Sequence, residues 1–181
     1  GYGGSCFPKD TRALVSTSKQ FKTNLSIVKS VINSNKSRYK ILISKINKIM
    51  KNKLKSKNIT FLGVTFKPGT DDMREAPSLS IVPDLIDKGF NVSIYDPQAN
   101  KNGIKEFEEA SWEADIYSVA KKSECIVILT EWNEFINMDL KKISDIMSQP
   151  IIIDFRNLFS LDSMKKLNIE YHSIGRETIN S

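Results

Sequence analysis

Five short apolar segments, spaced along the chain after residue 58, constrain the fold most strongly. They lie at 59–64, 91–95, 125–129, 151–154 and 169–172. They are nearly continuous in Ile, Val and Leu, as strands must be when helices cover both of their faces. Helical patterning fills the intervals, over 78–88, 114–122, 140–147 and 161–167. This alternation, with right-handed crossovers, predicts an α/β fold built on a doubly wound parallel sheet.

The first of these helices shows its boundaries in the sequence. Pro77 and Ser78 are typical of a helix start, and Gly89 of a helix end. Pro83 lies inside the segment and predicts a kink or a second start, because proline has no N–H to donate.

A different pattern covers residues 20–53, which contain no Gly or Pro. Spacings of three and four alternate, with one polar member, through Leu25, Val28, Ile32, Asn35, Tyr39, Leu42, Ile46 and Ile49. This heptad stripe predicts one helix from about Phe21 to Lys51, about 45 Å long.

Such a rod exceeds what one small domain can cover. Val31, Ile41 and Ile43 add further apolar surface to the stripe. We expect the rod to bridge two domains, to pair with a second copy of the chain, or both, with Leu42 in the pairing surface. Burial along a single core is the alternative. The favoured interpretation is a homodimer formed through this helix.

The net charge of +6 is unevenly distributed. Residues 1–57 hold 14 Lys and Arg against one acid, whereas 58–181 hold 13 against 20 acids. A basic half suits nucleic acid or an acidic ligand. However, 36–57 contain Tyr39 as their one aromatic residue and no nucleic-acid motif. We therefore expect a solvated helix face and no nucleic-acid partner. No apolar run approaches the ~20 residues of a membrane span, so we expect no membrane partner.

Two cysteines, Cys6 and Cys125, provide no disulfide framework. Cys125 lies in an apolar strand pattern and is interpreted as structural. A reduced, cytoplasmic protein fits this cysteine usage best.

Cys6 belongs to the opening run Gly-Tyr-Gly-Gly-Ser-Cys-Phe-Pro-Lys-Asp. The glycines allow close backbone approach to a ligand, and Pro8 suits the first position of a helix. In such a helix Lys9 and Asp10 share a side with Cys6, at i+3 and i+4. The helix end and the Lys9 ammonium both favour a thiolate. This constellation predicts a site of covalent catalysis, although a small residue in a tight turn is the alternative.

Three polar segments follow strands of the predicted sheet, at 66–75, 130–133 and 154–157. Ligands bind beyond the carboxyl ends of such strands. Lys67 and Arg74 in the first segment suit phosphate, although no Gly-x-Gly-x-x-Gly loop is present. Asp71 and Asp72 could instead pair with Arg74 or cap a helix.

Asp96 follows the second strand, where an acid could bind a ribose hydroxyl. An Asp-Pro turn, with Pro97, is the interpretation that we favour.

Together these residues resemble the bacterial UDP-glucose 6-dehydrogenases. The opening run matches their catalytic-cysteine loop, and 63–77 matches a loop of their C-terminal domain. Segments 129–135, 154–157 and 173–176 follow in the family's order, so the resemblance covers essentially the whole chain.

The resemblance implies three parts: an N-terminal NAD-binding domain, a long central helix at the dimer core, and a C-terminal Rossmann-like domain that holds the UDP-sugar. Residues 1–56 would be the cysteine loop and dimerisation helix, and 57–181 the UDP-sugar-binding domain. We expect the NAD-binding domain to be absent, the chain to be the C-terminal portion of a longer protein, and the chain alone to be inactive.

The resemblance also implies a two-step oxidation of UDP-glucose to UDP-glucuronate with two NAD reduced. Cys6 would form a thiohemiacetal and then a thioester, and Asp10 would activate the water that hydrolyses it. Lys9 would contact NAD or stabilise the thiolate, and Arg74 would contact NAD. The substrate contacts would come from Tyr2, Gly3, Gly4, Ser5, Phe66, Lys67 and Arg156. No metal is expected.

Two alternatives remain from the sequence. The chain could be a non-catalytic module for nucleotide-sugar binding and dimerisation. It could also serve a related nucleotide sugar, such as GDP-mannose.

Overall fold

The computed structural model describes residues 1–51, 53, 55–100, 104–121 and 123–180, and six parallel strands form one sheet within them. The strands are β1 (Asn58–Leu62), β2 (Asn91–Tyr95), β3 (Ser111–Trp112), β4 (Cys125–Ile128), β5 (Ile151–Asp154) and β6 (Glu170–Ser173). From edge to edge their order is β3-β2-β1-β4-β5-β6, and every neighbouring pair is parallel. The predicted doubly wound sheet is confirmed, and its winding reverses between β1 and β4.

The helices alternate with these strands as the pattern predicts. They are α1 (Cys6–Gln20), α2 (Ser26–Met50), α3 (Ser78–Asp87), the 3₁₀ turn η2 (Lys105–Phe107), α4 (Ile116–Ala120), α5 (Asn133–Ile136), α6 (Leu140–Ile146) and α7 (Leu161–Met164). The short elements β3, η2 and α5 were not predicted, because two to four residues are too few to show a period. Helix α3 continues through Pro83 without a second start.

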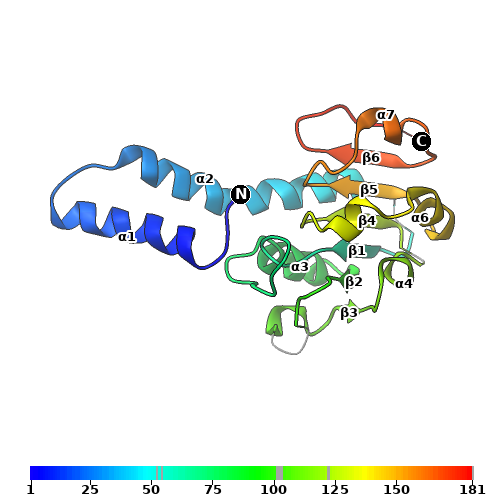
Figure 1. Cartoon of the computed structure of the whole chain (residues 1–181), viewed down its shortest axis with the longest axis horizontal. Coiled ribbons are helices and arrows are strands. Elements are labelled where there is room, and N and C mark those ends of the chain that lie inside the picture. Colours follow the sequence, from blue (N-terminus) through cyan, green and yellow to red (C-terminus); the bar gives the residue numbers. More distant parts are fainter. Residues whose placement is uncertain (52, 54, 101–103, 122, 181) are drawn as a thin grey trace.

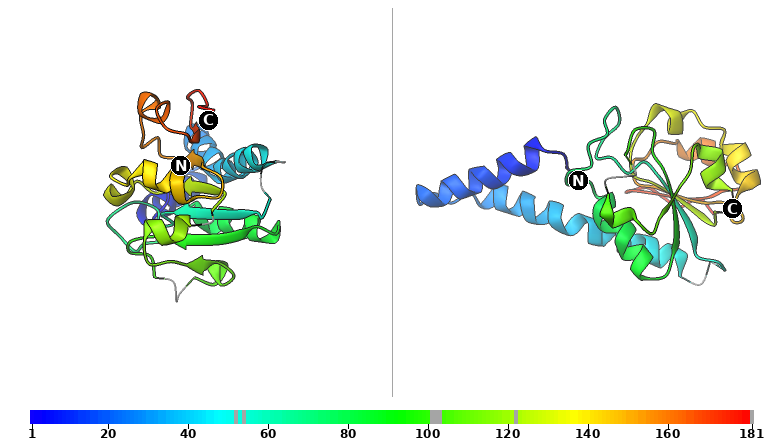
Figure 2. Two further views of the ribbon diagram at one scale, coloured as in Figure 1. Left: turned by 90° about the vertical axis from the view of Figure 1, so that its right-hand side faces the viewer. Right: turned by 90° about the horizontal axis from the view of Figure 1, so that it is seen from below.

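Each strand divides its side chains between two helical layers. Ile59 and Phe61 of β1 belong to a core that they share with α2, α3 and η2, whereas Leu62 belongs to a core shared with α4, α5, α6 and α7. Figure 2 shows these helices on opposite sides of the sheet. Cys125 is fully buried in the first core, which confirms its structural role, and this burial raises the pKa of its thiol.

Helices α1 and α2 form a hairpin that projects from the sheet domain (Figure 1). The predicted rod from about Phe21 to Lys51 was wrong at its start, since α2 begins at Ser26. The chain reverses between the helices, where Lys22 takes a left-handed φ of 52°. No Gly or Pro marks this reversal, so the sequence pattern did not reveal it.

The heptad stripe packs within the chain. Leu42, Ile46 and Ile49 are 8%, 0% and 8% exposed, in the core beneath α3. The prediction that Leu42 lies in a surface for a second copy was therefore wrong. The exposed apolar residues of α2 are Ile27, Val31 and Ile41, outside the stripe.

Candidate functional site

The loops after β1 and β4 meet at the carboxyl edge of the sheet, where these strands are neighbours. Gly63 has a φ of 80°, and a Cβ there would lie 2.5 Å from the Cβ of Thr130. Thr130 Oγ1 donates a hydrogen bond of 2.6 Å to the Thr65 carbonyl. Both the dihedral angle and the space therefore require glycine at 63. The two loops meet at the point where the winding reverses, which is the usual ligand position in such sheets.

Asp96 closes the same edge from the end of β2. Its Oδ2 accepts hydrogen bonds from the N–H groups of Val64 and Thr65, at 2.8 and 3.1 Å, and from Thr65 Oγ1 at 3.0 Å. Its Oδ1 accepts from the N–H groups of Gln98 and Ala99. The carboxylate is 8% exposed and bonded at both oxygens, so it forms the turn and does not present a free acid to a ribose.

The segment 66–75 presents two cations beside this edge. The Arg74 guanidinium forms a fork with Asp72, in which Nε donates at 2.9 Å and Nη2 at 2.8 Å. This hydrogen-bonded ion pair lowers the pKa of Asp72 and raises that of Arg74. The alternative pairing of Asp72 with Arg74 is confirmed. Lys67 lies over its neighbour Phe66, 5.4 Å from the ring centroid.

The cysteine loop docks on this same segment. The Gly4 N–H donates to the Arg74 carbonyl at 2.7 Å. A Cβ at Gly4 would lie 2.7 Å from Cζ of Phe66, and one at Gly3 would lie 2.6 Å from the Glu75 carbonyl oxygen. The glycines therefore permit a close backbone contact between two segments that are more than 60 residues apart.

Asn35 of α2 holds the beginning of the loop. The Tyr2 N–H donates to its Oδ1 at 2.8 Å, and its Nδ2 donates to the Tyr2 carbonyl at 2.9 Å. The Tyr2 ring packs edge-on against Phe7, with centroids 4.5 Å apart. The polar member of the heptad stripe thus binds the cysteine loop.

Cys6 begins helix α1, as the sequence indicates, and its thiol is exposed. Ser5 Oγ lies 3.5 Å from the Cys6 sulfur. Pro8 is the third residue of α1 and not the first. It still lies within the first turn, whose N–H groups have no partner inside the helix. Lys9 and Asp10 share the next turn, with Lys9 Nζ 3.7 Å from Asp10 Oδ1. The Lys9 ammonium thus has Asp10 as a carboxylate partner, one turn of α1 beyond Cys6.

Arg156 follows β5, on the far side of the β4 loop. Its Nη2 donates to Glu131 Oε1 at 2.7 Å, and its Nε lies 2.6 Å from Oε2. Asp154 shapes the turn, because its carboxylate accepts from the N–H groups of Arg156 and Leu158.

A hydrogen-bonded network that includes buried Tyr171 holds Asp154, which shapes the Arg156 turn. Tyr171 donates its hydroxyl proton to Asp154 Oδ2 at 2.7 Å, and Arg176 donates to the Tyr171 oxygen at 2.9 Å. The pKa of the Tyr171 hydroxyl is raised mainly by burial and also by Asp154.

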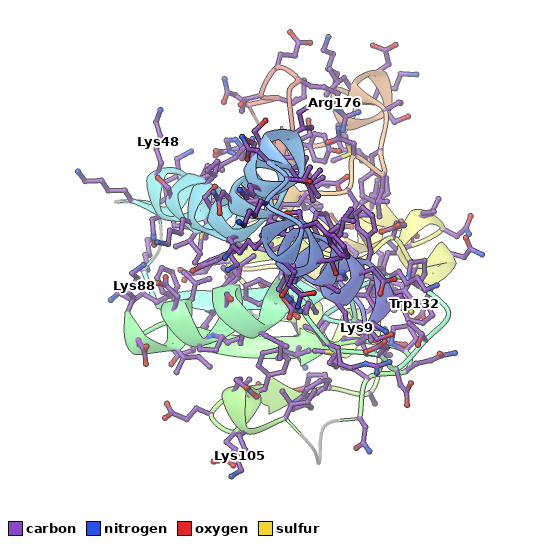
Figure 3. All side chains as sticks on the ribbon, turned by 90° about the vertical axis from the view of Figure 1, so that its left-hand side faces the viewer. Lys9, Lys48, Lys88, Lys105, Trp132 and Arg176 are labelled. Atoms are coloured by element: carbon purple, nitrogen blue, oxygen red, sulfur yellow. The ribbon has the colours of Figure 1, made fainter. Side chains whose placement is uncertain are left out.

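Figure 3 shows Arg176 at one end of the domain and Lys105, near β3, at the opposite end. In this view Lys9, on α1, lies between them.

The fold thus brings the three predicted segments and the cysteine loop to one edge. Sequence reasoning missed Asn35 as a partner of the loop and Glu131 as the partner of Arg156. The lone polar position in the stripe was the available signal for Asn35. Within the described residues, no cluster of three His, Cys, Asp or Glu side chains could hold a metal ion.

Comparison with known proteins identifies the fold and its lineage. The model of the UDP-glucose/GDP-mannose dehydrogenase family, UDP binding domain, matches residues 60–161, and that of the central domain matches 1–37. The chain belongs to this family.

Curated relatives agree with the family assignment. The chain is 40% identical over 177 residues to the UDP-glucose 6-dehydrogenase of Rickettsia bellii, covering 97% of this chain and 41% of that protein. It is 38% identical to the UDP-glucose 6-dehydrogenase TuaD of Bacillus subtilis, covering 99% and 39%. The chain therefore spans about two fifths of the length of these relatives.

Solved structures share the fold. A UDP-glucose dehydrogenase from Pyrobaculum islandicum superposes with a TM-score of 0.75 at 24% identity, over 95% of this chain and 37% of that one. A GDP-mannose dehydrogenase from Pseudomonas aeruginosa superposes with a TM-score of 0.72 at 24% identity, over 96% and 39%.

The family uses NAD, and the sheet described above does not fit this dinucleotide. Its first loop lacks the glycine pattern, and Asp96, at the position of a ribose-binding acid, is bonded at both oxygens. At the cysteine edge, the cations Lys9 and Arg74 each pair with a neighbouring carboxylate. No helix in the described part of the chain has the length and apolarity to cross a membrane.

Proposed function

We propose that this chain carries the thiol and the sugar-nucleotide site of an enzyme that oxidises UDP-glucose to UDP-glucuronate. The docking of the Cys6 loop on the 66–75 segment supports this proposal most directly, because Gly4 bonds to the backbone of Arg74 at the ligand edge of the sheet. A nucleophile at a helix start beside a phosphate-binding edge suits covalent oxidation of a bound sugar.

The chemistry centres on the Cys6 sulfur. The thiolate attacks the C6 aldehyde of the half-oxidised sugar, the C–S bond forms, and the aldehyde oxygen takes up a proton to give a thiohemiacetal. Loss of a hydride from C6 and of the hydroxyl proton gives a thioester. Water then attacks the thioester, the C–S bond breaks, and the carboxylate and the free thiol result. Asp10 positions and deprotonates that water, and Lys9 stabilises the negative charge beside it.

The substrate contacts come from two sides. Tyr2, Gly3, Gly4 and Ser5 cradle the sugar through their backbone. Phe66 and Lys67 contact the UDP-sugar, and Arg156 contacts the UDP moiety. Since Glu131 pairs with Arg156 in this structure, the nucleotide has to compete with or share that ion pair.

The remaining parts of the enzyme follow from the length of the relatives. We infer that residues 1–56 form the catalytic loop and dimerisation helix, that 57–181 form the UDP-sugar domain, and that a separate domain binds NAD, with contacts from Lys9 and Arg74. NAD, when bound, accepts the hydride in each oxidation. The working unit is a homodimer through α2.

The test is Cys6→Ser in the longer protein that contains this chain. We expect NADH formation from UDP-glucose to fall by at least about 10³-fold, because the nucleophile is lost. UDP-glucose affinity, measured by calorimetry, should stay within about twofold, because the cradle is backbone. Near-normal NADH formation by the serine variant would refute the covalent mechanism.

The same calorimetry, with NADH formation measured beside it, distinguishes the alternative functions. Binding of GDP-mannose in preference to UDP-glucose would assign the chain to another nucleotide sugar. Binding of UDP-glucose with no NADH formation by the wild-type longer protein would favour a non-catalytic module.

A further inference from the structure

Asn35 occupies an unusual position for a polar side chain. It is the one polar member of the apolar stripe on α2, and it is half-buried at the place where the cysteine loop crosses the helix. Ile32 precedes it in the stripe and Tyr39 follows it, both half-buried. An apolar residue would continue the stripe, so the amide calls for an explanation in terms of its partners.

Those partners are the two backbone groups of a single residue. Asn35 Oδ1 accepts from the Tyr2 N–H at 2.8 Å, and Asn35 Nδ2 donates to the Tyr2 carbonyl at 2.9 Å. The amide therefore pairs with Tyr2 as a neighbouring strand would. Neither a carboxylate nor an apolar side chain of this size could satisfy both groups.

The paired residue lies four positions before the thiol, in a loop that needs fixing. Three of the first four residues are glycine, and such a segment has more conformational freedom than any other. The loop has a second backbone anchor at Gly4, on the Arg74 carbonyl. Beyond the thiol, Arg12 pairs with Glu75 at 2.9 Å. Asn35 is the anchor that ties the loop to α2.

We propose that Asn35 is a positioning residue for Cys6. It holds Tyr2 against α2, so that the glycine loop enters α1 at one register and presents the thiol at the ligand edge. The role of Asn35 in catalysis rests on the proposed function. Its structural content, that Asn35 controls the loop and the Cys6 environment, can be measured on this chain without any turnover.

The first experiment compares Asn35→Ala and Asn35→Asp with the control Asn33→Ala, an exposed asparagine of the same helix. Asn35→Asp keeps the size and the acceptor for the Tyr2 N–H but faces the Tyr2 carbonyl with a carboxylate. Alanine favours helix, so the fold of α2 should survive the substitutions to Ala. Amide hydrogen exchange at Gly4 should quicken about tenfold in both Asn35 variants, which corresponds to about 1.4 kcal/mol. Asn33→Ala should match the wild type.

The second measurement follows the thiol itself. Iodoacetamide labelling at pH 7, resolved by mass spectrometry, should change at Cys6 by about threefold or more in the Asn35 variants, because the loop that leads to Cys6 is no longer held against α2. Cys125 is fully buried and serves as the internal control for intact folding. Unchanged Gly4 exchange and Cys6 labelling in Asn35→Ala, with Cys125 still protected, would overturn the proposal.

A final comparison separates positioning from catalysis. In the longer protein, Asn35→Ala should lower kcat at saturating UDP-glucose about tenfold, because the thiol is misplaced even when the sugar is bound. Loop and labelling effects without any wild-type turnover would contradict the proposed function and leave the positioning role supported. Turnover unaffected by Asn35→Ala would contradict the catalytic meaning of the role.

Discussion

One oxygen of Glu170 joins the end of the α2 segment to β6. Glu170 Oε1 lies 2.5 Å from Lys53 Nζ and 2.6 Å from His172 Nε2. Thr178 Oγ1 lies 3.3 Å from His172 Nδ1, and the Lys45 ammonium donates to the Ser173 carbonyl nearby. His172, the one histidine of the chain, is 9% exposed. Its burial lowers its pKa below the usual 6.5, and this outweighs the opposing effect of Glu170.

This residue predicts a pH dependence of stability. A histidine whose pKa is lowered by folding binds a proton more readily in the unfolded chain, so its contribution is complete above about pH 6.5 and is lost as the pH falls. We expect the free energy of unfolding, from urea titrations, to decrease between pH 7 and about pH 5. His172→Gln should flatten this decrease. Carboxylates with a lowered pKa, among them Glu170, change the free energy of unfolding only below about pH 4.5, outside the range from pH 7 to pH 5. A wild-type stability that rises on acidification to pH 5 would disprove the assignment.

At the scale of elements, α2 has two apolar surfaces with different roles. The stripe ending in Leu42, Ile46 and Ile49 completes the core of the sheet domain. Ile27 and Ile41, at 79% and 64% exposed, lie outside it. This second surface is therefore uncovered within the chain. A second copy of α2 is therefore proposed to meet the Ile27–Ile41 side of the helix.

Two adjacent residues test this division. Leu42→Asp should destabilise the fold by several kcal/mol, because it buries an unpaired carboxylate. Ile41→Asp should leave stability within about 0.5 kcal/mol and weaken dimerisation at least about tenfold. Urea titrations measure the first effect, and light scattering over a concentration series measures the second. A wild-type chain that stays monomeric at high micromolar concentration would rule out the dimer in this chain.

The whole molecule combines a complete sheet domain with one hairpin, and together they span about two fifths of the relatives' length. The charge follows the same division, since residues 1–57 carry +13 and the rest −7. The sheet domain covers both faces with helices, so it folds around its own two cores. We propose that the hairpin and the cysteine edge are the surfaces that meet other parts of the enzyme.

We expect these 181 residues alone to form no NADH from UDP-glucose and NAD, because their sheet has no dinucleotide loop. Spectrophotometry of the purified chain tests this, with intact mass measured to exclude a longer contaminant. UDP-glucose binding, measured in the same sample by calorimetry, shows whether the sheet domain is functional. Steady NADH formation by the pure chain would mean that the cofactor site lies within it.

The amino-acid sequence alone determined the longer strands and helices of the sheet domain and the edge of the sheet that carries the candidate site. Continuous Ile, Val and Leu runs specify buried parallel strands, and parallel strands place their following loops at one edge, so 66–75, 130–133 and 154–157 could be assigned together. Only the tertiary structure decided which face of α2 is buried, that Asp96 is bonded at both oxygens, and that Asn35 binds Tyr2. Each of these needs at least one contact between residues about 30 or more positions apart, such as the bond from Val64 to Asp96 Oδ2, which local periodicity does not encode. The same sequence pattern is compatible with other contact partners for these residues. The packing of the whole chain selects the partners that are observed.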